Sequence, residues 1–273
     1  MLASAGVGVL VGVLSGLLGI GGGTVMVPVF RLVFGLSPIE ATATSLFAII
    51  PTSVAGAVTH LRNKTCVLKL GLAAGLAGAV MSPVGVLLAS VSPDWLIMAA
   101  AACVILYSSI SMLRKALAMD GKAAAAASAE KPQDPDAPSS SSEAEVEMTG
   151  RKIAIGAAIG LAAGLLGGYV GVGGGFIMVP LFISVLGVSM RLASGTSLIA
   201  VMLIAIPGTI EQAVLGNIAF TAGIALVAGS IPGALLGANL VKYVPERLLR
   251  FLFAGFLAVV AVMLVANEVG FPG

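Results

Sequence analysis

The chain has 273 residues, of which 59% are hydrophobic and only 10% are charged, and its mean hydropathy is +1.12. Soluble domains carry about 25% charged residues, and 13 of the 26 charged residues here fall in one segment, 114–152, so the remainder cannot form a water-soluble surface. A net charge of +2 gives no support for nucleic-acid binding, and one histidine with two cysteines is too few for a zinc site, so we expect a membrane protein without metal or other cofactor.

Apolar runs of about 20 residues are long enough to cross a bilayer as helices. Two shorter runs, 24–35 and 176–187, each follow three consecutive glycines and are predicted to be half-helices. The sequence therefore predicts an all-α integral membrane protein. Its eight expected transmembrane helices lie at about 2–20, 40–60, 67–90, 94–113, 153–170, 192–212, 218–241 and 247–267.

The chain is expected to divide into two membrane repeats, 1–113 and 153–273, joined by a linker. The linker, 114–152, is polar and acidic in its centre and rich in Pro and Ser. Because such a composition cannot bury a core, the linker is predicted to be disordered.

The two halves repeat each other in sequence. A shift of 152 residues places Gly21–Gly23 on Gly173–Gly175 and gives 15 identities over the 30 positions 21–50. Ahead of these glycines, GLLG at 16–19 also occurs at 164–167. This second match predicts a four-residue expansion, 168–171, in the second copy, which would make the two half-sites unequal.

Lysine and arginine concentrate in cytoplasmic loops. In the first repeat they lie at 60–69 and after residue 113, whereas the matching loop of the second repeat, 215–217, is uncharged. The second repeat carries its basic residues at Arg191 and within 242–250. This opposite bias predicts two inverted repeats, each with four long helices and one half-helix, and a cytoplasmic linker.

The glycine runs are the main candidate site. Consecutive glycines destabilise a helix by up to about 1 kcal/mol each, and backbone groups freed in hydrocarbon need a protein or ligand partner. The positive end of the following short helix favours an anion, and transporters bind substrate where such breaks of inverted repeats meet. The alternative is that the glycines only permit close helix crossings. The substrate-binding residues expected here are Gly21, Gly22, Gly23, Thr24, Gly173, Gly174 and Gly175.

Small hydroxyl residues open the next helix in both copies, at Thr44-Ser45 and Thr196-Ser197. These side chains could donate to an oxyanion or bond to carbonyls of their own helix, and both uses stay open. We include all four as candidate substrate ligands.

Three ionisable residues at membrane depth are candidates for function. His60, which matches Gln212, and Glu211 are proton-coupling candidates, although an interfacial capping role is favoured for both. Arg31 could steer anions or pair with another charge at the interface.

At these residues the chain resembles the sulfite exporter TauE/SafE family. The resemblance is carried by G-L-L-G-I-G-G-G-T-V-M-V-P at 16–28, A-T-A-T-S-L-F at 41–47, and their second copies at 164–180 and 193–199. It implies an inner-membrane protein that exports sulfur-containing anions such as sulfite, small organosulfonates or thiosulfate. The expected partners are this anion and the lipid bilayer, with a homodimer left open.

The leading hypothesis is a secondary transporter with alternating access and, as an extension, proton coupling. A passive anion channel of the same architecture is the alternative. An intramembrane hydrolase using Ser15 or Ser45 with His60 is disfavoured, because no second histidine and no G-x-S-x-G motif occur, so we expect no catalytic residues.

Overall fold

The computed structural model describes residues 2–127 and 149–270, which form ten α-helices and, within these ranges, no strand. The first repeat contains α1 (Leu2–Leu18), α2 (Gly23–Leu32), α3 (Pro38–Arg62), α4 (Leu68–Ser90) and α5 (Asp94–Ala127). The second contains α6 (Gly150–Val170), α7 (Gly175–Val185), α8 (Met190–Val214), α9 (Phe220–Leu240) and α10 (Glu246–Gly270).

These helices confirm the predicted all-α membrane architecture. In the part of the chain that the structure describes, six of the eight expected helices are long and apolar enough to cross a membrane: α3, α4, α5 as far as Arg114, α6, α8 and α9. The expected span at 2–20 is present as α1, which is among the shorter apolar helices, and the one at 247–267 corresponds to α10, which is not among the six. The half-helices expected at 24–35 and 176–187 are present as the short apolar helices α2 and α7.

The two repeats match helix by helix, and the starts of α7, α8, α9 and α10 follow those of α2, α3, α4 and α5 by 152 residues. For example, α2 and α7 begin at Gly23 and Gly175, and α1 and α6 end at Leu18 and Val170. The expected four-residue expansion at 168–171 is therefore wrong, because the copies align through the glycine break without a gap. The error has a physical origin: α6 carries glycines four residues apart, so a slip of about one helical turn also produces a match.

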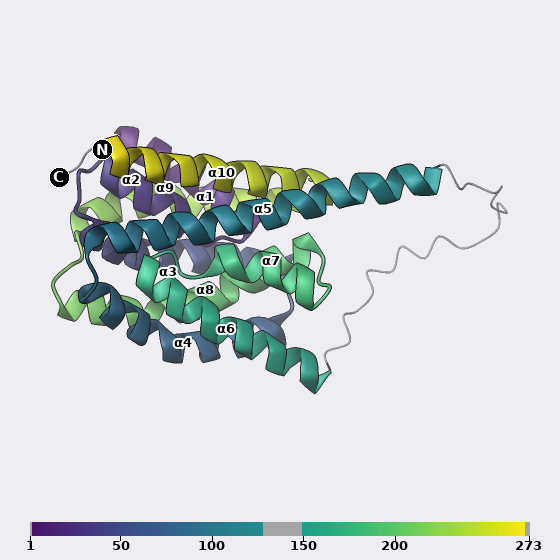
Figure 1. Cartoon of the computed structure of the whole chain (residues 1–273), viewed down its shortest axis with the longest axis horizontal. Helices are drawn as coiled ribbons and strands as arrows, with labels where there is room; N and C mark the ends of the chain where they lie inside the picture. The colour runs from purple at the N-terminus through teal and green to yellow at the C-terminus, as the bar shows by residue number, and fades with distance from the viewer. Residues whose placement is uncertain (1, 128–148, 271–273) are drawn as a thin grey trace.

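Matched helices run in opposite directions, as inverted repeats require. Thr44, near the start of α3, accepts a hydrogen bond from the amide of Ala219, just after the end of α8. Thr196, near the start of α8, accepts one from Val67, just after the end of α3. The contacting helices α5 and α10 are also antiparallel in Figure 1, where α5 runs to the right and α10 returns to the left.

Helices of one repeat pack directly against helices of the other, through glycines spaced four residues apart. Helix α6 lies along α4, and α1 lies along α9. A Cβ atom at Gly160 or Gly164 would collide with the backbone of Ala74 or Gly78 of α4, so only glycine permits this approach. The protein interior is therefore formed by helices of both repeats together. A site at the interface between the repeats has residues from both.

The outer face of α4 shows how the fold meets lipid. Large apolar side chains recur every four residues along this face, and Leu76 and Val80 are 59% and 71% exposed. A continuous apolar stripe of this kind is what a helix presents to a hydrocarbon environment. The glycine face of the same helix is directed inward, at Gly71 and Gly75.

Basic loops from both repeats meet at one end of the molecule. Asn63, after α3, donates to the side chain of Asn239 near the end of α9, at 3.0 Å. Arg191, at the start of α8, donates to the carbonyl of Val244, at 3.3 Å. The inverted arrangement therefore places the basic residues of the two repeats on the same side.

Helix α5 continues to Ala127, beyond residue 114 where the linker was expected to begin. Its last turns contain the alanine run 123–127, and alanine has the highest helix propensity of any residue. Helix α6 begins at Gly150, also inside the expected linker. Residues 128–148 lie outside the described residues, so disorder there stays a prediction.

Candidate functional site

The two glycine breaks, residues 19–23 and 171–175, lie directly against each other at the interface between the repeats. A Cβ atom at Gly23 would lie 2.7 Å from Cα of Val172, and one at Gly175 would lie 2.7 Å from the carbonyl oxygen of Ile20. Because these are contacts with backbone atoms, neither position accepts a side chain. The N-terminal ends of α2 and α7 are thus brought together, as expected of a site shared by the repeats.

Glycine is also required in the breaks by backbone conformation. Gly21 and Gly22 have φ of 77° and 84°, and Gly173 and Gly174 have φ of 72° and 79°. All four values lie in the left-handed region that side chains disfavour. Both breaks also face Val201 of α8, whose Cγ1 would lie 2.5 Å from a Cβ at Gly21 and 2.9 Å from one at Gly173.

The first break leaves several backbone donors available. Its first amide, of Gly19, donates to the carbonyl of Ser15 at 2.9 Å. Within the described part of the chain, the amides from Ile20 to Thr24 have no hydrogen-bond acceptor. These donors lie at the positive end of α2, a position that favours negative charge.

Three buried hydroxyl groups accompany these amides. Ser15, Thr24 and Ser53 are at most 1% exposed, and their side-chain oxygens have no hydrogen-bond partner in the described part of the chain. Oγ of Ser53 would lie 3.2 Å from a Cβ at Gly21, Oγ of Ser15 would lie 3.5 Å from one at Gly22, and Thr24 is in the first turn of α2. Buried hydroxyls are usually bonded, so this cluster is unusual.

Sequence reasoning did not single out Ser53 and considered Ser15 only as a nucleophile. The signal was present in the repeat itself, since the gap-free alignment pairs Ser15 with Gly167 and Ser53 with Ala205. A polar residue retained in only one of two matched apolar helices is a candidate for function, because burying an unpaired hydroxyl is unfavourable.

The first three amides of the second break are bonded to the preceding helix, whereas those of Gly174–Phe176 have no acceptor in the described part of the chain. The carbonyl oxygen of Gly167 accepts the amides of Gly171, of Val172 at 3.2 Å and of Gly173 at 3.4 Å. A Cβ at Gly167 would lie 2.6 Å from the amide nitrogen of Gly174, so glycine at this position lets the backbone close on itself. The residue matching Thr24 is Phe176, which has no hydroxyl.

The four hydroxyl residues of α3 and α8 divide into two kinds. The threonines, Thr44 and Thr196, accept the backbone amides described above and so join the ends of α9 and α4 to the other repeat. Ser197 donates to the carbonyl of Gly19 at 2.6 Å, and Ser45 donates to that of Gly23 at 3.5 Å. The serines therefore hold backbone carbonyls of the first break.

His60 joins three segments at the end of α3. Its Nε2 donates to the carbonyl of Gly16 at 2.9 Å, which leaves Nδ1 to accept from the hydroxyl of Thr65 at 2.7 Å. In the second repeat Gln212 and Asn217 occupy the same two positions and are bonded at 2.8 Å. Both repeats thus use this position to connect the end of a long helix to the following loop.

Glu211 and Arg31 lie away from the breaks. Glu211 is on the last turn of α8, at the opposite end of the antiparallel α3–α8 pair from His60. Arg31 is in the last turn of α2, whereas the break precedes the first turn. The Ser-His pairing needed by a hydrolase is not formed, since the ring nitrogens of His60 contact Gly16 and Thr65 rather than Ser15 or Ser45.

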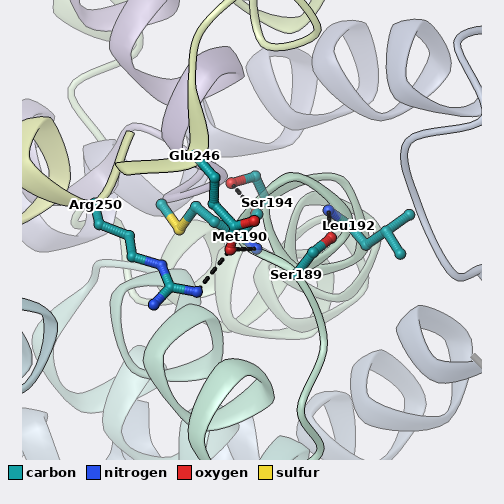
Figure 2. Close-up of polar contacts among 6 residues, drawn as sticks. All are labelled: Ser189, Met190, Leu192, Ser194, Glu246 and Arg250. Carbon is teal, nitrogen blue, oxygen red and sulfur yellow. Dashed lines mark hydrogen bonds and ion pairs between the residues drawn. The ribbon is translucent and has the colours of Figure 1, made fainter. Parts of the chain in front are cut away.

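The start of α8 is held by a cap that reaches from α10. Oε1 of Glu246 accepts the amide of Met190 at 3.0 Å and is bonded by Arg250 at 2.6 Å, as Figure 2 shows. Oγ of Ser189 accepts the amide of Leu192 at 3.4 Å. One turn on, the backbone of Ser194 lies against Gly19, so this cap helps to set the position of α8 beside the first break.

Comparison with known proteins identifies the relatives of this chain. The family model described as Sulfite exporter TauE/SafE matches residues 4–264. The probable membrane transporter protein YdhB of Bacillus subtilis (strain 168) is 27% identical over 242 residues, covering 88% of this chain and 90% of that protein. YunE, also a probable membrane transporter protein of that strain, is 26% identical over 240 residues, covering 85% of each. No solved structure matches.

Proposed function

The chain belongs to the sulfite exporter TauE/SafE family, and from this membership we propose that it exports small sulfur-containing anions such as sulfite or an organosulfonate. It is a multi-pass membrane protein of a transporter family. The proposed substrate lies where the two glycine breaks meet.

The observation that carries this proposal is the direct packing of the two breaks. Gly23 lies against Val172, and Gly175 lies against Ile20, so two helix N-termini face one location. Each N-terminus carries roughly half an elementary positive charge, and in the described part of the chain each offers amides without an acceptor, at Gly22–Thr24 and at Gly174–Phe176. Together these groups favour a negatively charged solute without a lysine or an arginine.

Inverted repeats also supply a mechanism for movement. Rocking of one repeat against the other around a fixed site gives alternating access. The alternative is a passive channel of the same architecture. Counterflow in proteoliposomes distinguishes the two, because a carrier shows counterflow and a channel does not.

The test of the proposed site uses two glycines with similar backbone conformations. Gly22 has φ of 84° at the break, whereas Gly187 has φ of 69° and open space within 4 Å. Gly22→Ala should reduce sulfite flux at least about tenfold, and Gly187→Ala should keep it, since both variants add similar strain. Normal flux in folded Gly22→Ala protein would refute the site.

The finer parts of the proposal concern coupling and orientation. Proton coupling through His60 or Glu211 is a secondary extension.

The linker, 114–152, is proposed to face the cytoplasm from the inner membrane, because the basic loops that meet near Asn63 and Arg191 fit the positive-inside rule. Accessibility labelling of a cysteine placed in the linker tests this orientation.

A further inference from the structure

We propose that the oxygen atoms of the anion bind to the first break, through the hydroxyls of Ser15, Thr24 and Ser53 and the amides of Gly22–Thr24, and that this site selects singly charged oxyanions. This inference rests on the proposed function and deepens it. It assigns unequal roles to two halves that share one backbone design.

The hydroxyls carry the first step of the argument. Many buried hydroxyls elsewhere have partners: Thr52 is bonded to Ser230 at 2.6 Å, and Ser109 donates to the carbonyl of Ala254 at 2.8 Å. Of the buried hydroxyls without a partner in the described residues, three lie at the first break, and the others are those of Ser82, Ser108 and Thr209. A buried hydroxyl without an acceptor destabilises a fold. Three of them surround one helix N-terminus that has unpaired amides, which is the arrangement of donors that an oxyanion would satisfy.

The hydroxyl donors are present at the first break only. Ser15, Thr24 and Ser53 are matched by Gly167, Phe176 and Ala205, whereas the amides of Gly174–Phe176, like those of Gly22–Thr24, have no acceptor in the described part of the chain. The anion therefore has hydroxyl partners on one side only. The second break contributes the positive end of α7, which faces the same location.

Charge selection follows from the kind of groups present. The atoms nearest to Gly21, Gly22 and Gly23 belong to Ser, Met, Ile and Val residues, none of which carries a charge. The ends of α2 and α7 together supply about one positive elementary charge. They balance a monoanion, whereas a dianion would keep a net charge in a buried site, and the cost of burying charge rises steeply with its size.

The test compares methanesulfonate with sulfate, two tetrahedral oxyanions that differ in charge, by calorimetric titration of the purified full-length protein. Wild-type protein should bind methanesulfonate at least about tenfold more tightly. Ser15→Ala and Ser53→Ala should each weaken that binding roughly ten- to a hundredfold, because a hydrogen bond to a charged group is lost. Their melting temperatures without anion should not fall, since each variant removes an unpaired hydroxyl.

The matched control is Ser108→Ala. Ser108 is also fully buried and without a partner in the described residues, but it lies on α5, so this variant should bind methanesulfonate like the wild type. Equal binding of sulfate would overturn the charge selection, and unchanged binding by Ser15→Ala and Ser53→Ala would overturn the residue assignment. Either result leaves the proposed function standing, whereas a wild-type protein that binds neither anion, nor sulfite or thiosulfate, would overturn both.

Discussion

The two glycine breaks have the same backbone and different chemistry. Gly19, Gly21 and Gly22 have φ of 74°, 77° and 84°, and the residues matching them have φ of 75°, 72° and 79°. Three unpaired hydroxyls accompany the first break, whereas at the second the carbonyl of Gly167 accepts the amides of Gly171, Val172 and Gly173. The glycines thus meet a requirement of the fold in both halves, and the chemistry depends on the residues around them.

The comparison also explains why a helix break alone does not identify a binding site. A break exposes backbone amides, but the fold can satisfy them internally, as Gly167 does for three amides of the second break. Ser15 stands at the matching position of the first repeat, where its carbonyl accepts only the amide of Gly19. The two breaks therefore differ in two amides: those of Val172 and Gly173 are bonded to Gly167, whereas the matching amides of Ile20 and Gly21 have no acceptor in the described residues.

The largest expected difference concerns stability after adding a methyl group to each break. At Gly174 the new Cβ would collide with the carbonyl of Ala163, whereas at Gly22 it would lie 2.9 Å from Met26 Cε, the end of a flexible side chain. Gly174→Ala should lower the free energy of unfolding by about 2–5 kcal/mol, and Gly22→Ala by about 1–2 kcal/mol. Thermal unfolding in detergent measures both, and equal losses would contradict the tighter packing of Gly174 relative to Gly22.

Exchanging the matched residues Ser15 and Gly167, which precede the two breaks, should have different effects on stability and on anion binding. Gly167→Ser should destabilise the protein by about 1–3 kcal/mol, because its Cβ would lie 2.6 Å from the amide nitrogen of Gly174. Ser15→Gly should lower stability by only about 0.5 kcal/mol, the difference in helix propensity, but should weaken methanesulfonate binding. If Gly167→Ser is tolerated and Ser15→Gly binds normally, the two positions are equivalent and the comparison fails.

The smallest effect on stability and transport is expected at the ends of α3 and α8, where different residues of the two repeats make equivalent hydrogen bonds to the following loop. His60→Gln installs the residue found at the matching position, Gln212, and should cost about 1 kcal/mol because one of the bonds to Gly16 and Thr65 is lost. Sulfite flux and its pH profile should be retained if His60 is a cap. A flat pH profile in this variant would instead make His60 a proton-coupling residue.

The helices and the breaks were predictable from the sequence because each follows from a local pattern. Runs of about 20 apolar residues set the long helices, and the triple glycines at 21–23 and 173–175 mark their interruptions. The inverted topology followed from lysine and arginine, since the positive-inside rule needs no tertiary information. These features confirm how much of a membrane fold is encoded locally.

The polar half of the site was not predictable in the same way. Ser15 and Ser53 are single hydroxyl residues within apolar runs, and their importance depends on which residues face them across the repeat. The apparent GLLG match at 164–167 hid that pairing by shifting the alignment one turn. For the hydroxyls of α3 and α8 the sequence allowed two uses, and one of them, bonding to a carbonyl of the same helix, is found at Thr196, which donates to Leu192 at 2.6 Å. Only the tertiary contacts show that Thr44 and Thr196 also accept backbone amides of neighbouring helix ends.

The most direct test of the account is to locate a bound anion. Crystals of the full-length protein grown with methaneselenonate, a heavier analogue of methanesulfonate, would reveal the selenium position by anomalous scattering. The account predicts a single strong peak within hydrogen-bonding reach of the first break, beside Ser53 and the amides of Gly22–Thr24. A peak at the basic end of the molecule, or none at the junction of the breaks, would contradict it.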